Sequence, residues 1–276
     1  MSAALQTDQF VKLVYEAAEL NKFVAASSTA TEFANILDLL GSRSGGARSP
    51  NLFASDSSML YQGGDNNAVR VQALSPSAQT IADTLKTIGS VICTSPENRR
   101  FRSLTPNHLS VALQVSAGAV DLLLKADLEN TSEPHRGWKA VLSSKLRPQR
   151  KSGIVKVGHH GSQNADNHEV WLDMVMANPL CVVAPYSRLE EPLPTRADLE
   201  RIASRTDQCY VTTWPPSTRV KGRPEVDRWL DGATKVRRGL ARDPGFVRVR
   251  FDMDAVAPVP SVELFGSACK NPSMRG

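Results

Sequence analysis

The chain has 276 residues, of which 41% are hydrophobic and 22% charged, and its formal net charge is +5. These values are ordinary for a globular protein that buries a core in one large domain or two small ones. No apolar run reaches membrane-spanning length, and the first residues lack the basic-then-apolar profile of a signal peptide, so we expect no membrane partner.

The cysteines give no sign of a zinc ribbon or a disulfide framework. Four are present, with no Cys-x-x-Cys spacing among them: Cys93, Cys181, Cys209 and Cys269. Cys181 and Cys209 lie in apolar strand patterns and are predicted to be core thiols. Such usage is typical of a reducing compartment, and we expect a cytoplasmic protein.

Basic residues gather in four short segments, at 99–102, 145–151, 219–223 and 235–238. Basic clusters in loops are often plain solvated surface. They are also the side chains that bind phosphate backbones, so an anionic substrate is the functional alternative. Arg219, Lys221 and Arg223 are candidate substrate-binding residues on this ground.

The first forty residues predict two helices. Apolar residues recur at helical spacing in Phe10–Ala17 and again in Phe33–Leu40, and the second helix follows the capping box Thr29-x-x-Glu32. Gly41–Pro50 is rich in glycine and serine and predicts a flexible loop. We therefore expect a helical segment at 1–50, a domain at 51–265 and a frayed tail at 266–276.

From Asn51 the pattern becomes α/β, with short apolar strands alternating with helical segments. Helices are predicted to start at Ser75-Pro76-Ser77, at the Asp166-x-x-Glu169 cap and at Thr195, and a further helix holds Trp138. Strands are predicted at 69–73, 109–115, 119–125, 154–157, 180–184, 208–213 and 246–251, the last as an edge strand with Arg248 and Arg250 outward. The nearly continuous apolar run 119–124 predicts a sheet that is covered on both faces.

The segment Gly158-His159-His160-Gly161-Ser162 follows the predicted strand at 154–157. Its glycines allow a sharp turn that leaves both imidazoles at the carboxyl end of the strand, where open α/β folds place their sites. Neutral imidazole is well suited to bind zinc or a similar metal. The alternative is a pair of partly exposed loop histidines with no ligand.

Asp127 follows the predicted strand at 119–125. A carboxylate in this position is most often a turn former or a helix cap. One predicted helix separates Asp127 from His159, which indicates a βαβ unit. Such a unit would place both groups at the same end of neighbouring parallel strands.

Three motifs resemble those of one enzyme family. Lys156–Ser162 resembles the late histidine motif of metallo-β-lactamase-fold hydrolases, in the branch that includes the hydrolase domain of bacterial DNA-uptake channel proteins. Asn107-His108-Leu109-Ser110 is similar to the Asn-x-x-Ser strand start of that branch. Leu122–Asp127 is similar to its Leu-Leu-x-Gly-Asp strand end, with Ala126 in place of glycine, which is tolerable where φ is negative.

The resemblance implies an α/β fold that is the carboxyl-terminal half of a metallo-β-lactamase αβ/βα sandwich, with a mixed sheet and two extra amino-terminal helices. It also implies a divalent metal, zinc or manganese, held by Asp127 and by either His159 or His160, and a phosphodiester substrate such as nucleic acid or a nucleotide. His108, Lys156 and Ser162 are weaker substrate-binding candidates, whereas His135 and His168 are expected at the surface.

The opening His-x-His-x-Asp-His cluster of the family has no counterpart, because the first histidine of this chain is His108. One aspartate and one histidine are fewer than the three or four protein ligands of a zinc site. The chain is then one part of a split hydrolase, a relic module that binds nucleic acid or a protein partner without catalysis, or a truncated protein. We expect a second chain that carries the missing histidine cluster.

Overall fold

In the computed structural model the chain divides into two compact units, Met1–Phe53 and Ala54–Gly276. The structure describes residues 54–65, 68–92, 106–186, 192–214, 245–255 and 258–274, all of them in the second unit. The two predicted amino-terminal helices, the loop at 41–50 and the basic segments at 99–102, 219–223 and 235–238 lie outside these residues. No helix in the described ranges is long and apolar enough to cross a bilayer.

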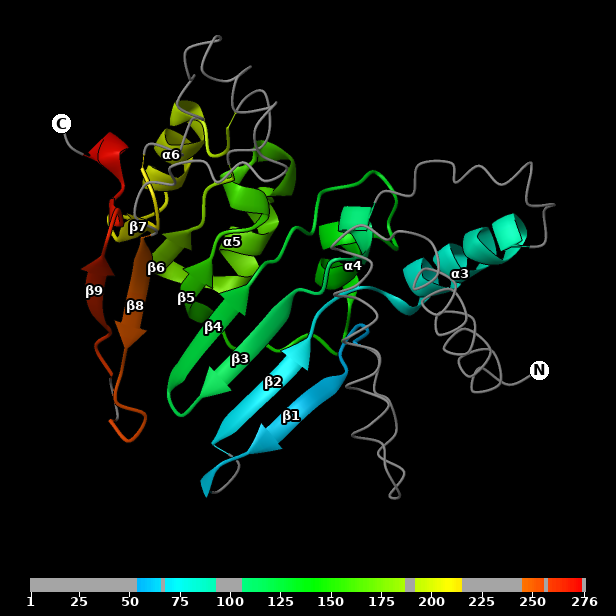
Figure 1. Ribbon diagram of the computed structural model, residues 1–276. Coiled ribbons are helices and arrows are strands. Elements are labelled where there is room, and N and C mark those ends of the chain that lie inside the picture. The colour runs from blue at the N-terminus through cyan, green and yellow to red at the C-terminus, as the bar shows by residue number, and fades with distance from the viewer. Residues whose placement is uncertain are drawn as a thin grey trace, which may run out of the picture. The chain divides into compact units, whose positions relative to one another are not determined.

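Eight strands form a mixed sheet in the order β1-β2-β3-β4-β5-β6-β7-β10 (Figure 1). The first four are antiparallel neighbours: β1 (Met59–Gly63), β2 (Val69–Ala73), β3 (Leu113–Ala117) and β4 (Val120–Leu124). From β4 onward the neighbours are parallel: β5 (Ser152–Lys156), β6 (Val175–Val183) and β7 (Cys209–Val211). β10 (Cys269–Lys270) lies antiparallel to β7 at the edge.

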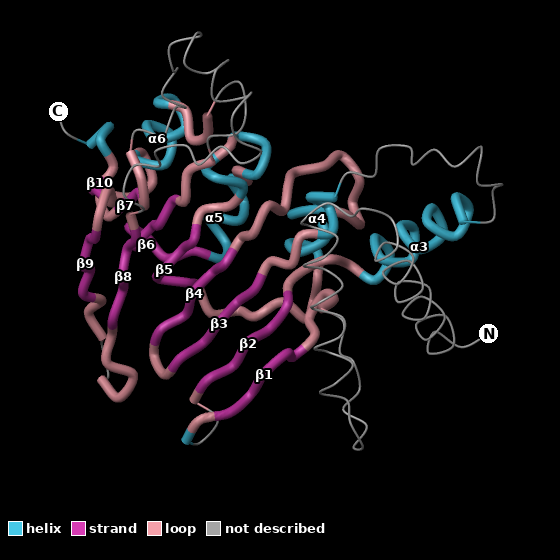
Figure 2. The backbone as a smooth tube through the Cα atoms, viewed as in Figure 1, coloured by secondary structure: helices cyan, strands magenta, loops and turns pink. Residues whose placement is uncertain are grey.

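Four α-helices accompany this sheet in the described residues, and together they confirm the predicted α/β class. They are α3 (Ala78–Ile92), α4 (Gly137–Ser143), α5 (His168–Met174) and α6 (Arg196–Ala203). The last three connect successive parallel strands and lie along one side of them (Figure 2). As predicted, α3 begins directly after Ser77, whose hydroxyl accepts from the Thr80 N–H, and Thr195 closes a capping box at α6.

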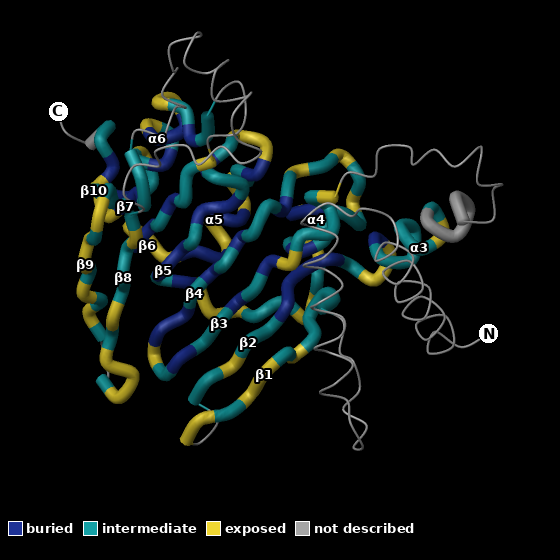
Figure 3. The backbone as a smooth tube through the Cα atoms, viewed as in Figure 1, coloured by how far each residue is buried: buried dark blue, intermediate teal, exposed yellow. Residues whose placement is uncertain are grey.

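The main core lies between the parallel strands and these helices. It joins side chains from three helices to one face of β4–β7: Trp138, Val141, Val170, Trp171, Met174, Leu199 and Ile202 against Leu123, Val155, Cys181, Val183, Cys209 and Val211. The central strands are accordingly buried in Figure 3. The prediction of core thiols is confirmed, because Cys181 and Cys209 are fully buried; this burial raises the pKa of both thiols, that of Cys209 to about 12.

A two-stranded sheet packs on the opposite face. β8 (Phe246–Arg250) pairs with β9 (Ser261–Phe265), and Val249, Phe251 and Val262 pack against a second cluster centred on Val120, Ile154 and Leu180. The predicted edge strand therefore forms, but it belongs to a separate sheet, with Arg248 and Arg250 both paired to Glu263. The sequence predicted that both faces of the sheet around 119–124 are covered. At β4–β6 this chain itself covers both, with the helices on one face and β8 and β9 on the other.

Three predicted boundaries are wrong. Pro106–Leu109 forms a 3-10 helix (η3), so that β3 starts at Leu113 and not at Leu109. The N-cap of α5 is Asn167, since the Asp166 carboxylate is taken up by the Trp171 indole N–H and by Arg201. β6 begins at Val175, five residues before the apolar run at 180–184 that predicted this strand.

The prediction that residues 266–276 form a frayed tail is also wrong for most of that segment. Cys269–Lys270 joins the sheet as β10, and Pro272–Met274 forms a short 3-10 helix (η6). Asn271 is fully buried, donates from its backbone to the carbonyl of Cys209 and from its amide to the carbonyl of Leu199. These bonds tie the segment around Asn271 to β7 and α6.

Candidate functional site

The site is built from two turns that follow neighbouring parallel strands. Ala126 and Asp127 follow β4, and the histidine pair follows β5 in one tight turn (η4, His159–Gly161), whose positive φ values distinguish it from a regular 3-10 helix. The His159 N–H donates to the Ala126 carbonyl oxygen at 2.8 Å. The expectation that Asp127 and the histidines lie at the same end of parallel strands is confirmed.

The backbone of both turns is in the left-handed region. φ is +43° at His159, +57° at His160, +92° at Gly161 and +46° at Ala126. The condition under which alanine would be tolerated at position 126, a negative φ, is therefore not met, and a glycine there would be favoured. Left-handed conformations cost non-glycine residues on the order of 1 kcal/mol each, and they persist where the surrounding contacts fix the geometry.

The His159 ring is held by a carboxylate that the sequence does not single out. Nδ1 of His159 lies 3.1 Å from Oε1 of Glu129 and 3.0 Å from Oδ1 of Asn164. The same Glu129 oxygen accepts from the side-chain amides of Asn164 and Asn107, both at 2.8 Å. Asn164 lies in the next short helix (η5, Gln163–Ala165), and Asn107 lies in η3, so three segments meet at Glu129.

The His160 ring is held separately. Its Nδ1 lies 2.8 Å from the carbonyl oxygen of Ala184, just beyond β6, and its ring stacks on Tyr186 with centroids 5.0 Å apart. The two imidazoles have centroids 6.1 Å apart and are inclined at 61°. In both, Nδ1 faces oxygen acceptors, which leaves Nε2 as the nitrogen with a free lone pair in the neutral ring.

A buried charged layer lies under the histidine turn. Lys125 is almost fully buried, with its ammonium 5.1 Å from the Trp138 ring centroid and 5.0 Å from that of Trp171. Desolvation lowers the pKa of Lys125 to about 8, and the negative charge of Asp166 acts against that shift. Arg201 of α6 joins this layer to the turn by donating to the carbonyl of Gly161.

The other predicted site residues that the structure describes lie near the histidine turn, but no hydrogen bond or ion pair joins their side chains to the two imidazole rings. Asp127 makes no side-chain hydrogen bond or ion pair with any described residue, although its charge acts on Lys156 at the end of β5. Burial lowers the pKa of Lys156, and Asp127 opposes this effect. Ser162 lies beside Lys125 and Arg201 at a void that has no room for a water molecule. Asn107, the neighbour of His108 in sequence, contacts the histidine cluster, whereas His108 does not.

The basic segment at 145–151 lies at the other end of β5 from the histidines. Arg150 pairs with the buried Asp121 at 2.7 Å, and Lys151 donates to the carbonyl of Leu172. β5 separates this segment from the histidine turn by about 16 Å, given five residues of strand. Arg219, Lys221 and Arg223 lie outside the described residues.

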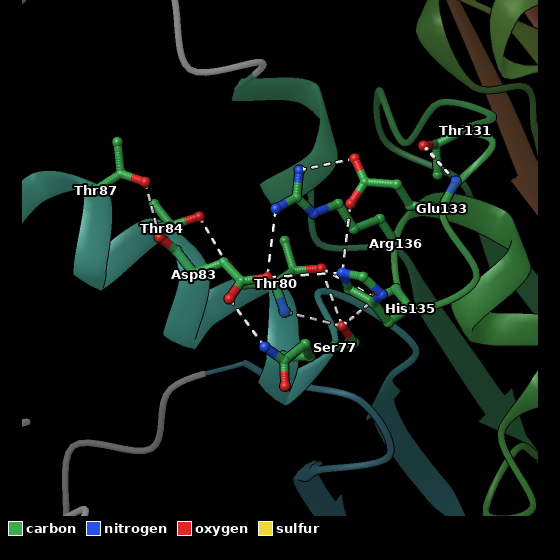
Figure 4. A network of polar contacts seen from close by, with 10 residues as sticks. Ser77, Thr80, Asp83, Thr84, Thr87, Thr131, Glu133, His135 and Arg136 are labelled. Carbon is green, nitrogen blue, oxygen red and sulfur yellow. Dashed lines mark hydrogen bonds and ion pairs between the residues drawn. The ribbon is translucent and has the colours of Figure 1, made fainter. Parts of the chain in front are cut away.

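The two remaining histidines lie near the surface. The His135 side chain is 40% exposed and lies between Asp83 and Glu133, with Arg136 beside both carboxylates (Figure 4). This network attaches the start of α3 to the loop before α4, because Ser77 and Thr80 both donate to the His135 carbonyl. His168 is exposed at the start of α5.

The metal-binding capacity of these residues is incomplete. No group of three His, Cys, Asp or Glu residues that could hold a metal ion occurs within the described ranges. Asp127, His159 and His160 are suitable in kind but too few for a closed site. A search among protein-family models, characterised proteins and solved structures finds no match to this chain.

Sequence reasoning missed Glu129, Asn164 and Tyr186. Glu129 and Asn164 each stand two residues after a candidate site residue, Asp127 and Ser162 respectively. Their position in turns after neighbouring parallel strands is the signal that could have found them. Tyr186 had no comparable signal, because its contact with His160 depends on the path of the chain after β6.

Proposed function

We propose that this chain supplies half of a metal-dependent phosphodiesterase site, which a partner chain carrying a His-x-His-x-Asp-His cluster completes. The observation that supports this most strongly is that both histidines engage Nδ1 with an oxygen acceptor. Histidines that bind metals almost always donate their second ring nitrogen to a carboxylate, a carbonyl or water.

The residues that would hold the metal are Nε2 of His159 or His160 and the carboxylate of Asp127. A zinc or manganese ion bound there would activate water and polarise a phosphoryl oxygen. Because the described residues offer fewer than three converging ligands, the remaining ligands must come from elsewhere. This shortage is the reason for assigning the rest of the site to a partner.

The proposed substrate is a phosphodiester, in nucleic acid or in a nucleotide. Its class follows from the resemblance of Lys156–Ser162 to the hydrolase motif. Lys156 is the described cation closest in sequence to the histidine turn, and it is the last residue of β5, the strand that leads into that turn. An ammonium in that position suits an anionic substrate.

A non-catalytic binding module is the second candidate. It is favoured by the absence of a three-ligand group from the described residues and by the left-handed Ala126 in place of glycine. Under this alternative the histidines would contact a nucleic acid or protein ligand directly and would need no metal.

Metal titration and hydrolysis separate the two candidates. The full chain is titrated with zinc, alone and mixed with a candidate partner that carries the histidine cluster, and hydrolysis of a generic phosphodiester is followed. We expect weak binding alone and stoichiometric binding with activity in the complex. Asp127→Ala, His159→Ala and His160→Ala should reduce both, whereas the exposed His168→Ala should not.

Two results would contradict the proposal. Stoichiometric, chelator-resistant zinc in a lone monomer would show that the partner is unnecessary. A complex that binds no zinc, yet binds nucleic acid through His159, would establish the binding module instead.

A further inference from the structure

We propose that Glu129 is a positioning residue, which holds His159 in the tautomer protonated on Nδ1 and so presents Nε2 to the ligand of the site. The tautomer follows from the geometry alone. Its role in catalysis rests on the proposed function, and the two parts are tested separately.

The hydrogen-bond pattern leaves one arrangement of protons. The Asn164 amide nitrogen donates to Glu129, so the other atom of this amide, the oxygen, is the one 3.0 Å from His159 Nδ1. The second neighbour of Nδ1 is Oε1 of the Glu129 carboxylate, which can only accept while ionised. With acceptors on both sides, Nδ1 must carry the hydrogen, and the neutral ring then has none on Nε2.

The Glu129 carboxylate that contacts the imidazole is itself held in place by other hydrogen bonds. The Asn107 amide, from the short helix before β3, donates to the same Glu129 oxygen at 2.8 Å. Asn164, from the segment after β5, donates to the same oxygen, also at 2.8 Å. The Glu129 side chain is 15% exposed and that of His159 18% exposed, so water screens their interaction less than at an open surface.

The cluster also brings together three sequence features that are separate in the chain. Asn107 belongs to the Asn-x-x-Ser motif, Glu129 follows the strand that ends at Asp127, and Asn164 follows the His-His-Gly-Ser segment. Glu129 supplies one carboxylate oxygen, and Asn107, Asn164 and His159 all contact that oxygen. This convergence is what a support for one catalytic or ligand-binding side chain requires.

Nuclear magnetic resonance on the full chain, with ¹⁵N-labelled histidine, reports the tautomer directly. Long-range ¹H–¹⁵N correlations at a pH where the imidazoles are neutral distinguish a protonated ring nitrogen from a bare one. We expect His159 to carry its hydrogen on Nδ1. Replacement of His159 by Gln assigns the signal among the five histidines of the chain.

Variants then test the cause. Glu129→Ala should shift His159 toward the Nε2-protonated form, and the double variant Glu129→Ala, Asn164→Ala should complete the shift. Glu129→Gln should retain the Nδ1 hydrogen, because the amide oxygen of glutamine can accept the same bond. His160 is an internal control, since its Nδ1 is held by the Ala184 carbonyl.

Glu133→Ala is the matched control. Glu133 lies four residues further along the same loop and also contacts a histidine, His135, at 3.4 Å (Figure 4). Its ion pairs are with His135 and Arg136, not with His159. Its removal should leave the His159 tautomer unchanged. The inference is overturned if wild-type His159 carries its hydrogen on Nε2, or if the double variant keeps it on Nδ1.

Activity tests the second part. In an active complex, Glu129→Ala should lower kcat by about 10-fold to 100-fold, with Glu129→Gln recovering part of the loss and KM changing little. An unchanged kcat, alongside the expected tautomer shift, would refute the positioning role in catalysis. If every complex is inactive while the tautomer behaves as expected, the proposed function fails and the geometry of Glu129 stands.

Discussion

The backbone N–H of His159 donates a 2.8 Å hydrogen bond to the carbonyl oxygen of Ala126, and this bond joins the turn after β4 to the turn after β5. Asp127 and Glu129 come directly after the acceptor residue Ala126, and the donor residue His159 is the first of the histidine pair. The distance between the candidate carboxylates and imidazoles therefore depends on how closely these two backbones approach.

Gly158 permits that approach, and Gly158→Ala should disturb it. A Cβ at this position would lie 3.0 Å from Cβ of Lys125 and 3.2 Å from the Ala126 carbonyl oxygen, both closer than ordinary contacts. We expect a loss of about 1–2 kcal/mol in the free energy of unfolding, because the two turns must move apart. Denaturant unfolding measures this loss.

Gly153→Ala, in β5, the strand that leads to Gly158, is the control. A Cβ there meets only the Met176 sulfur, at 3.4 Å. Because alanine restricts the unfolded chain more than glycine does, we expect a change between zero and a gain of about 0.5 kcal/mol. Equal losses for Gly153→Ala and Gly158→Ala would argue against a specific close contact.

Arg201 should be the most important charged side chain for the histidine turn. It contacts the carboxylates of Asp166 and Asp198, at 3.2 and 3.0 Å, and donates to the carbonyl of Gly161. Both aspartates are largely buried, so Arg201→Gln removes their cationic partner and should cost about 2–4 kcal/mol.

Arg196→Gln is the comparison on the same helix. Arg196 is 83% exposed and pairs with Glu200 one turn away, an arrangement that contributes less than about 0.5 kcal/mol. Thermal or denaturant unfolding of both variants gives the difference. Similar stability losses would mean that the contacts of Arg201 do not contribute as a buried network.

The fold could be predicted from the sequence where pattern and packing agree. Alternation at 69–73 and the apolar run at 119–124 located β2 and β4, and the helix between Asp127 and His159 predicted a parallel βαβ unit. β6 shows the limit, because the exposed residues Met176, Ala177 and Asn178 hide its first half from any apolar pattern. Likewise, β10 is only two residues long, and it is recognisable only from its pairing with β7.

The candidate site was predictable in its location but not in its contacts. The His-His-Gly-Ser segment and Asp127 identified the correct edge of the sheet. The position of Glu129 after β4 marks it as a candidate, but its contact with His159 could not be foreseen. Side-chain hydrogen bonds from Asn107 and Asn164, which are distant from Glu129 in sequence, hold the carboxylate against the ring. The positive φ of Ala126 could not be predicted either, because alanine rarely adopts that conformation.

Charge at the other end of β5 provides a test of nucleic-acid binding. Lys145 is exposed, whereas Arg150 pairs with the buried Asp121. If the segment 145–151 binds phosphates, Lys145→Glu should weaken binding to single- or double-stranded nucleic acid and reduce the salt slope by about 0.9 for each phosphate that is no longer neutralised. Filter binding across a salt series measures both the affinity and the slope.

Arg150→Ala serves as the contrasting variant, because it should act mainly on stability. Loss of the ion pair leaves the buried carboxylate of Asp121, whose side chain is 2% exposed, with the Ser116 hydroxyl as its remaining partner. We expect this to cost about 1–3 kcal/mol.

The nucleic-acid prediction fails if the salt slope is flat both for wild type and for Lys145→Glu. The segment 145–151 would then be ordinary solvated surface.

Lys125 should make the stability of the protein depend on pH. Burial lowers its pKa from 10.5 to about 8, so the unfolded chain binds this proton more tightly than the folded chain does. Stability must then rise with pH between about 8 and 10.5, by a total of about 3 kcal/mol, of which about 1 kcal/mol falls between pH 7 and 9. Cys209 has the opposite effect, because its raised pKa favours unfolding as the pH rises above about 9.

Comparison with Lys125→Met isolates the lysine, because both proteins contain the same cysteines. Methionine fills a similar space between Trp138 and Trp171 without a charge, so the variant should be as stable as wild type at pH 7 or more stable. Urea unfolding at several pH values should show wild type gaining on the variant as the pH rises. Lys139→Met removes an exposed amine from α4 and controls for the loss of one positive charge. Parallel profiles for wild type and Lys125→Met would mean that the buried amine keeps an ordinary proton affinity, and that the two tryptophans and Asp166 compensate fully for its burial.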